Sequence, residues 1–262
     1  MRWADIPDYF TLLRFLKKPG AFLHLRKHPM EGTHVDLELH RGGSVRLRNV
    51  PMDRHTFHRI FARDEYRLKG LREGSLGTVI DVGAHIGLFA LRVSPLATRV
   101  LSFEPVPANF ATLVHNVSSL PNVSAVPKAV TGRRETATIY VSDNPSAHSL
   151  YPSATELKTN PTRVECVTLE DVFSEYGVDR CGLLKLDCEG SEYSLLEAVP
   201  DSLWKRIDRV AMEYHPVAGG GESWTGERLE DRLRALGYEV RRMPSRKYLS
   251  KGLLFSERGT RI

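Results

Sequence analysis

Short apolar runs alternate with segments of helical periodicity from residue 78 to the end of the chain. Runs at 78–82, 100–103 and 182–186 have the composition of buried strands, and apolar residues recur at helical spacing in 86–93 and 107–118. This alternation is typical of an α/β fold, in which helices cover a doubly wound, mostly parallel sheet. The hydrophobic share of 41% also excludes a disordered tail, a collagen-like fibre and a simple coiled coil. Further strands are expected at 123–130, 136–141, 163–167, 209–214, 238–242 and 248–255.

The first 72 residues differ from the remainder in charge. They hold 15 Lys+Arg and 8 Asp+Glu, whereas residues 73–262 hold 22 and 24. The net charge of +5 therefore belongs to the N-terminal segment, and the remainder is slightly acidic. We divide the chain into a basic N-terminal extension or cap, residues 1–72, and an α/β domain, residues 73–262.

The extension has the pattern of a small α+β unit. Asp8 is placed to cap a helix that runs to about residue 18. Alternating residues at 35–39 and 44–50 predict a strand pair joined by a glycine turn, and 54–61 has helical spacing.

The sequence contains no signal for a membrane span or for secretion. No stretch approaches the ~20 apolar residues of a span, and the N-terminus lacks the apolar core of a secretory signal. The three cysteines, Cys166, Cys181 and Cys188, form no Cys-x-x-Cys pair, which argues against a disulfide framework or a zinc site. These features predict a cytoplasmic protein with reduced thiols.

A glycine turn follows the strand at 78–82. Gly83 and Gly87 bracket the turn, and such a turn lets a ligand approach the backbone closely. His85 stands where the dinucleotide fingerprint needs its middle glycine, so that fingerprint is absent. Asp81 at the strand end favours a ligand that carries positive charge and would repel a pyrophosphate.

Glu104 ends the next strand, 17 residues after Gly87. An acid at this place in a wound sheet accepts hydrogen bonds from the ribose hydroxyls of a nucleoside. Asp81 and Glu104 together therefore predict a pocket for a nucleoside with a cationic neighbour. S-adenosylmethionine, which carries a sulfonium and an ammonium group, fits this description better than a dinucleotide.

Four segments with a specific spacing resemble a known family. Residues 79–90 (Val-Ile-Asp-Val-Gly-Ala-His-Ile-Gly-Leu-Phe-Ala) are similar to motif I of class I S-adenosylmethionine-dependent methyltransferases. Together with 103–109, 184–192 and 210–216 they resemble the FkbM family, over about residues 76–256. The resemblance implies a Rossmann-like, seven-stranded sheet whose last strand is antiparallel. It also implies O-methylation of a hydroxyl group on a sugar, glycolipid, polyketide or other natural product.

The resemblance further implies which residues bind the cofactor. It places the turn after the first strand along the methionine and ribose of S-adenosylmethionine, and Glu104 on the ribose. With two further residues of the same motifs included, the predicted cofactor-binding residues are Asp81, Gly83, Ala84, His85, Gly87, Glu104, Pro105 and Asn109.

The acceptor is expected outside the carboxyl ends of the fourth and fifth core strands. Asp187 and Glu189 follow one of these strands, and Glu213 and His215 end the other. Methyl transfer to a hydroxyl needs a base that takes its proton, and a carboxylate or a histidine serves. We therefore expect these four residues to form the catalytic site.

Two alternatives at this edge stay open. The acids and the histidine also suit a divalent ion such as Mg²⁺, which would lower the pKa of the acceptor hydroxyl. His148 and Ser149, in a loop rich in Ser, Asn and Pro, are candidates for binding the acceptor.

Other functions are less favoured. A NAD-dependent dehydrogenase lacks its fingerprint here. A nucleic-acid methyltransferase is disfavoured because the acids at 187–190 would repel phosphates. The expected partner is a small-molecule or glycan hydroxyl acceptor. For the basic stretch at 9–27, a subunit interface of a homo-oligomer, a plain domain cap and peripheral contact with the inner face of a membrane are the alternatives.

Overall fold

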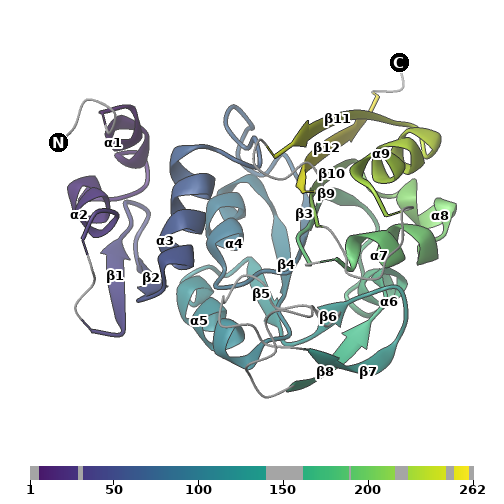
Figure 1. Cartoon of the computed structure of the whole chain (residues 1–262), viewed down its shortest axis with the longest axis horizontal. Coiled ribbons are helices and arrows are strands. Elements are labelled where there is room, and N and C mark those ends of the chain that lie inside the picture. Colours follow the sequence, from purple (N-terminus) through teal and green to yellow (C-terminus); the bar gives the residue numbers. More distant parts are fainter. Residues whose placement is uncertain are drawn as a thin grey trace.

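The computed structural model describes residues 6–28, 32–139, 162–188, 190–215, 224–245 and 251–259. Among them a central sheet has the strand order β11-β12-β10-β9-β3-β4-β5 (Figure 1). Its strands are β3 (Thr78–Val82), β4 (Arg99–Phe103), β5 (Val123–Val126), β9 (Cys181–Leu186), β10 (Arg209–Tyr214), β11 (Tyr238–Pro244) and β12 (Gly252–Arg258). β3, β4, β5, β9 and β10 pair in parallel, whereas β12 is antiparallel to both β10 and β11. The predicted α/β sheet of seven strands, with the last one antiparallel, is thus confirmed.

Buried side chains form a large hydrophobic cluster on each face of this sheet. Val79 and Ile80 are adjacent in β3 and belong to different clusters, as the alternation of side chains along a strand requires. One cluster includes residues of α4 (Leu88–Val93) and α5 (Pro107–Val117). The helices that contribute to the other are α6 (Leu169–Glu175), α7 (Glu192–Ala198), α8 (Asp201–Trp204) and α9 (Gly226–Ala235). Val114, which the helical spacing placed in the core, is exposed.

A separate three-stranded sheet lies beside the central one (Figure 1). It consists of β6 (Ala129–Val130), β7 (Glu135–Ile139) and β8 (Thr162–Val167). The expected single strand at 123–130 was wrong, because β5 ends at Val126 and the chain leaves the central sheet there. Pro127 follows directly and has no amide hydrogen to donate to a neighbouring strand.

The N-terminal residues form helices around a hairpin. They are α1 (Ile6–Leu12), α2 (Pro19–Leu25), β1 (His34–Glu38), β2 (Ser44–Arg48), α3 (Pro51–Phe57) and a π-helix at His58–Ala62. The antiparallel pairing of β1 with β2 is confirmed. α1 ends earlier than expected, because the following backbone bonds to the hairpin: Lys17 N–H donates to Glu38 O at 3.0 Å, and His40 N–H donates to Phe15 O at 2.9 Å.

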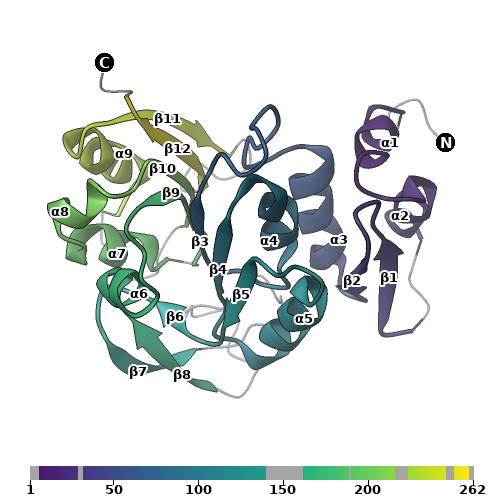
Figure 2. The ribbon, with the colours of Figure 1, turned by 180° about the vertical axis from the view of Figure 1, so that it is seen from behind.

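This N-terminal segment packs on the face of the sheet that carries α4 and α5. In both views α3 lies between the β1–β2 hairpin and α4 (Figure 1, Figure 2). Leu12, Leu16 and Phe22, from the stretch considered for membrane contact, are buried in the same hydrophobic cluster as Val79, while Phe10 is 63% exposed. No helix within the described ranges has the length and apolar content needed to span a bilayer.

Asn116, on α5, fastens the hairpin to the α/β domain. Its Oδ1 accepts the N–H of Arg46 in β2 at 2.7 Å, and its Nδ2 donates to Arg46 O at 3.1 Å. The same Nδ2 donates to Ile86 O at 2.7 Å. The buried amide therefore acts as a strand partner for β2 and links it to the turn after β3.

Candidate functional site

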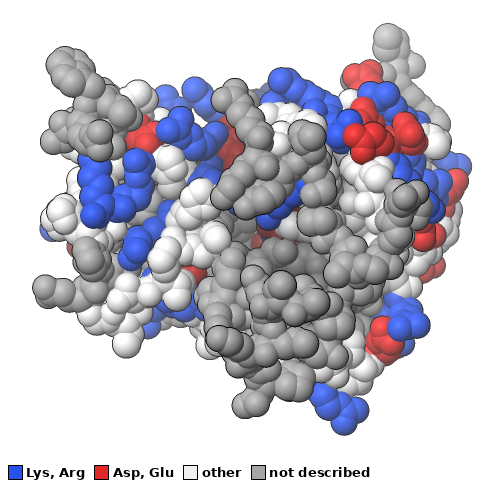
Figure 3. All heavy atoms as spheres, viewed as in Figure 1, with Lys and Arg blue, Asp and Glu red and all other residues white. Residues whose placement is uncertain are grey.

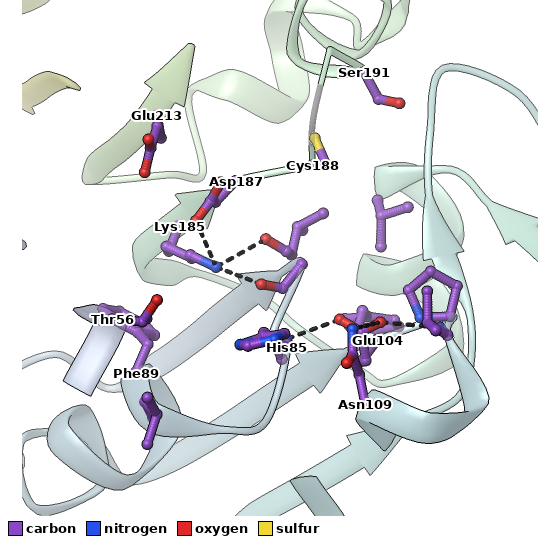
Figure 4. A pocket seen from close by; sticks show the side chains of 18 of the residues that line it. Thr56, His85, Phe89, Glu104, Asn109, Lys185, Asp187, Cys188, Ser191 and Glu213 are labelled. Atoms are coloured by element: carbon purple, nitrogen blue, oxygen red, sulfur yellow. Dashed lines mark hydrogen bonds and ion pairs between the residues drawn. The ribbon is translucent and has the colours of Figure 1, made fainter. Parts of the chain in front are cut away.

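A cavity of ≈ 410 Å³ lies at the carboxyl ends of the parallel strands. The turn after β3 and the segment after β4 line one end, and Asp187 and Glu213, from the ends of β9 and β10, line the other. α3 and the π-helix contribute a side wall, which includes Arg59. Thr56, on the same wall, is labelled in Figure 4.

The two glycines of the turn after β3 have different roles. Gly83 has φ of 76°, and a Cβ on it would lie 1.9 Å from the carbonyl oxygen of Asp187, so a side chain cannot fit. Gly83 lines the cavity. Gly87 has φ of 82° and precedes α4, and its Cβ would lie 2.6 Å from Cδ1 of Leu113. Gly87 does not line the cavity, so its role is to let α4 and α5 pack closely.

Glu104 is 4% exposed and lines the cavity. Its Oε2 accepts the N–H of His85 at 2.8 Å, and its Oε1 accepts the N–H of Val106 at 2.9 Å and Nδ2 of Asn109 at 3.3 Å (Figure 4). Burial raises the pKa of Glu104 to about 7, although these hydrogen bonds oppose the shift. A carboxylate has about four lone-pair sites, so Glu104 keeps capacity for a ligand hydroxyl.

Asp81 is placed differently from the prediction. It is fully buried beneath the cavity and does not line it. Its Oδ1 lies 3.1 Å from Nζ of Lys185, which also donates to Gly83 O at 2.6 Å. The cation expected beside Asp81 is therefore a lysine of this chain, and the pair holds the turn after β3 against β9. A bound ligand is not needed to balance the charge of Asp81.

Arg48, from β2, connects the N-terminal segment to this end of the cavity. Its guanidinium donates to Asn109 Oδ1 at 2.8 Å, and it lies 2.9 Å from Nε2 of His85. The same group forms two hydrogen bonds with the fully buried Asp53, both at 2.9 Å. No motif indicated Arg48 or Asp53, because their partners are brought together by the packing of the hairpin. Of the predicted cofactor-binding residues, the cavity is lined by Gly83, Ala84, His85, Glu104, Pro105 and Asn109.

At the other end, the structure brings Asp187, Glu213 and His215 together. Each offers a ligand atom within 4.8 Å of the other two. Nε2 of His215 lies 3.9 Å from Asp187 Oδ1 and 3.7 Å from Glu213 Oε1. Asp187 and Glu213 line the cavity, whereas His215 lies behind them. Glu189, His148 and Ser149, the other predicted catalytic and acceptor-binding residues, lie outside the described residues.

Glu192, at the start of α7, holds His215 in place. The fully buried carboxylate accepts the N–H of Cys188 at 2.9 Å and that of Gly190 at 2.8 Å. Its Oε1 also lies 3.2 Å from Nδ1 of His215. A protonated Nδ1 donates to this carboxylate, which directs Nε2 towards Asp187 and Glu213. The sequence prediction missed Glu192, although it lies in the segment 184–192 that resembles the family.

Two cations compensate the charge of Glu213. Arg59, from the π-helix, donates to Glu213 Oε2 at 2.8 Å, and Nζ of Lys251 lies 2.8 Å from Oε1. Burial alone would raise the pKa of Glu213, but His215, Arg59 and Lys251 hold it well below its usual range. Arg59 also pairs with Glu65, whose pKa burial raises to about 7.

The same contacts test the divalent-ion alternative. Asp187, Glu213 and His215 have suitable atoms, but both oxygens of Glu213 already bind cationic side chains. A divalent ion would have to displace Lys251 or Arg59 or accept their repulsion. The described residues therefore fit a carboxylate stabilised by basic side chains, and they do not fit a resident metal ion.

Several known proteins are similar to this chain. A model of the methyltransferase FkbM domain matches residues 81–240. The 31-O-demethyl-FK506 methyltransferase FkbM of Streptomyces tacrolimicus is 30% identical over 214 residues, which cover 70% of this chain and 82% of that protein. The AMB antimetabolite synthetase AmbE of Pseudomonas aeruginosa is 24% identical over 84% of this chain, and the match spans 12% of that protein.

A solved structure shares the fold. The methyltransferase FkbM of Methylobacillus flagellatus KT aligns with a TM-score of 0.51 and 14% sequence identity, over 97% of this chain and 59% of that one. The family model covers more than half of the chain, from the end of β3 into β11. The chain belongs to the FkbM methyltransferase family.

Proposed function

We propose that the chain transfers a methyl group from S-adenosylmethionine to a hydroxyl oxygen of a small-molecule or glycan acceptor. One observation carries the proposal: a single cavity has the backbone-held Glu104 at one end and the Asp187–Glu213 pair at the other. One end suits a nucleoside, and the other suits a hydroxyl that must lose a proton. The name of the Streptomyces tacrolimicus relative, which specifies a 31-O-demethyl acceptor, supports oxygen as the methylated atom.

The Glu104 end has the features that S-adenosylmethionine requires. The remaining lone pair of Glu104 accepts a ribose hydroxyl, and the absence of a side chain on Gly83 lets the ligand approach the backbone. Arg48 and Asn109 hold Glu104 and His85 in position before a ligand binds. When bound, S-adenosylmethionine supplies an electrophilic methyl group on its sulfonium.

At the acceptor end, Asp187 is the group best placed to take the hydroxyl proton. It lines the cavity, is 25% exposed, and receives a hydrogen bond from the Tyr66 hydroxyl at 3.3 Å. Glu213 is a weaker base, because Arg59 and Lys251 stabilise its ionised form. These two cations and Glu213 instead form a polar surface that orients the acceptor hydroxyl. His215 is a positioning residue, because it lies behind both carboxylates.

Calorimetric titration with S-adenosylhomocysteine tests the donor site. We expect the wild type to bind and Glu104→Ala to bind at least about tenfold more weakly, because a hydrogen bond to a charged group is lost and the turn that Glu104 holds is loosened. The matched control is Glu73→Ala, which removes an exposed acid that pairs with Arg41 at the surface. Failure of the wild type to bind, or unchanged affinity in Glu104→Ala, would refute the assignment.

A second assay tests the acceptor atom. The methylated product of each active compound is collected from a panel of hydroxylated acceptors and analysed by NMR. A methyl group on oxygen supports the proposal, whereas a methyl group on nitrogen or carbon contradicts it.

A further inference from the structure

The outer side of α3 lines a second hollow, of ≈ 630 Å³. Its lining residues are Arg26, Pro51, Met52, Arg54, His55 and His58. Met52 and His55 also line the cavity that holds Asp187 and Glu104, so the hollow adjoins that cavity across one helix. Residues of one short helix, α3, therefore border both spaces.

The hollow is basic. Its lining, as far as the structure describes it, contains two arginines, two histidines and no acid. One carboxylate behind it, the buried Asp8, lies 2.8 Å from Arg26 Nη1 and 2.7 Å from His58 Nε2. The same carboxylate also lies 3.7 Å from Arg63. Figure 3 shows Lys and Arg side chains gathered over this N-terminal side of the molecule.

Arg54 contributes a cation that no described residue neutralises. Within the described part of the chain its guanidinium has no hydrogen bond or ion pair, and its Nη1 is buried without a partner. A buried donor without a partner costs stability on the order of 1–3 kcal/mol, and more when it is charged. Other atoms of Arg54 line the hollow, so an anion bound there would lie beside this unpaired cation.

We propose that the hollow binds a phosphate group of the methyl acceptor. This inference rests on the proposed function, because it names the substrate class of the same site: a hydroxyl compound that carries a phosphate ester. The planar guanidinium of Arg54 matches two phosphate oxygens, and His55 and Arg26 stand at the same hollow to bind the third. The phosphate anchors the acceptor outside α3, while its hydroxyl reaches Asp187 inside.

Inorganic pyrophosphate is the probe, measured by calorimetry at constant ionic strength and pH 7 with S-adenosylhomocysteine titrated into the same samples. We expect the wild type to bind both ligands. Arg54→Gln should weaken pyrophosphate binding at least about tenfold, the loss of one charge-assisted bidentate contact, and leave S-adenosylhomocysteine binding unchanged. The matched control is Arg72→Gln, which removes an exposed arginine of the same N-terminal segment and should change neither affinity.

Several results would overturn the proposal. The first is that the wild type does not bind pyrophosphate, and the second is that Arg54→Gln binds it as tightly as the wild type. The third is that Arg72→Gln loses as much pyrophosphate affinity as Arg54→Gln, which would indicate unspecific electrostatic attraction. Binding to phosphatidylglycerol vesicles without binding to pyrophosphate would assign the basic surface to a membrane instead. If Arg54→Gln binds neither ligand, loss of the fold would explain the result, and Arg54→Lys is measured instead. Lysine keeps the positive charge but lacks the planar guanidinium that contacts two phosphate oxygens at once. Unchanged pyrophosphate affinity in Arg54→Lys would then contradict the proposal.

The two ligands separate this inference from the proposed function. Binding of S-adenosylhomocysteine without pyrophosphate leaves the methyltransferase proposal intact and removes the phosphate site. Binding of pyrophosphate without S-adenosylhomocysteine removes the donor site and leaves the phosphate site without its assigned role in methyl transfer.

Discussion

At the Glu104 end of the cavity, the carboxylate is held by His85, Val106 and Asn109, all within 19 residues of it. At the Asp187 end, the contacts join segments that are far apart in the sequence: Arg59 and Glu213 are separated by 154 residues, and Tyr66 and Asp187 by 121. The direct partners of the Glu104 carboxylate are therefore local and come from two βα turns, and Arg48 of β2 supports two of them from outside. The Asp187 end exists only when the N-terminal segment, β9 and β10 are assembled. We therefore expect mutations at the Glu104 end to change mainly the affinity for S-adenosylhomocysteine, and mutations at the Asp187 end to change mainly the turnover.

Asp187→Asn should have the largest effect on turnover. Loss of the base that takes the hydroxyl proton is expected to lower kcat by about 10²–10⁴-fold. Affinity for S-adenosylhomocysteine should stay within about threefold of the wild type, because the donor end is held by other residues. Steady-state kinetics and calorimetry measure the two quantities. Asp208→Asn, which alters a surface acid paired with Arg180, is the control. Normal turnover in Asp187→Asn would show that Asp187 is not the base and that catalysis does not depend on this end of the cavity.

Arg48→Met should have the largest effect on stability. It leaves the fully buried Asp53 without its cation, which typically costs about 3–5 kcal/mol. It also releases Asn109 and His85, so affinity for S-adenosylhomocysteine should fall as well. Urea denaturation measures the free energy of unfolding. Arg46→Met is a matched control two residues away, because the ion pair of Arg46 with Asp36 is exposed and contributes only about 0–1 kcal/mol. Equal losses in both variants would contradict the structural role of Arg48.

The pH dependence of donor binding should show the smallest of these effects. Burial raises the pKa of Glu104 to about 7. A ribose hydroxyl donates to the ionised carboxylate, so affinity for S-adenosylhomocysteine should increase about tenfold between pH 6 and pH 8. Glu104→Gln should remove this increase. Glu65→Gln should keep it, because Glu65 also has a pKa of about 7 but lies at the acceptor end. A flat profile in the wild type would mean that Glu104 is ionised throughout this range.

The raised pKa of Glu104 has the opposite effect on the stability of the ligand-free protein: stability falls as the pH rises, whereas ligand affinity increases. The unfolded chain ionises Glu104 near its ordinary value of 4.5, whereas the folded chain keeps the proton up to about pH 7. Glu104 therefore lowers the free energy of unfolding as the pH rises through this interval. A bound nucleoside should reverse part of the loss, because it stabilises the charged form.

The features that were predicted best from the sequence are those that depend on residues close together in the chain. The strand–turn–helix at 78–93 and Glu104 follow from glycine, strand and helix patterns, and the structure places Gly83, His85 and Glu104 at the cavity as expected. Asp81 shows what such local patterns do not predict, namely the partner of a side chain on an adjacent strand. Its position at a strand end was read correctly, but its partner Lys185 lies on the adjacent strand β9, which no local pattern reveals.

The acceptor end was predicted only in part for the same reason. The rule that parallel strands end at one edge brings Asp187, Glu213 and His215 together. Arg59 and Arg48 belong to an extension that we had treated as a separate cap. Their roles depend on how β2 and the π-helix pack against the sheet, and that packing is determined by buried apolar contacts spread over the whole N-terminal segment.

Asn116 gives this packing a further property. It holds β2 through the main-chain N–H and C=O of Arg46 and makes no hydrogen bond with that side chain. The contact is therefore compatible with any amino acid at position 46 except proline, which has no N–H to donate. Related chains can change the exposed side chains of the hairpin and still seat it on α5, provided that the asparagine is kept. The exposed side chains of the N-terminal segment can then change without moving β2 away from α5. The position of Arg48 beside the donor end of the cavity is kept.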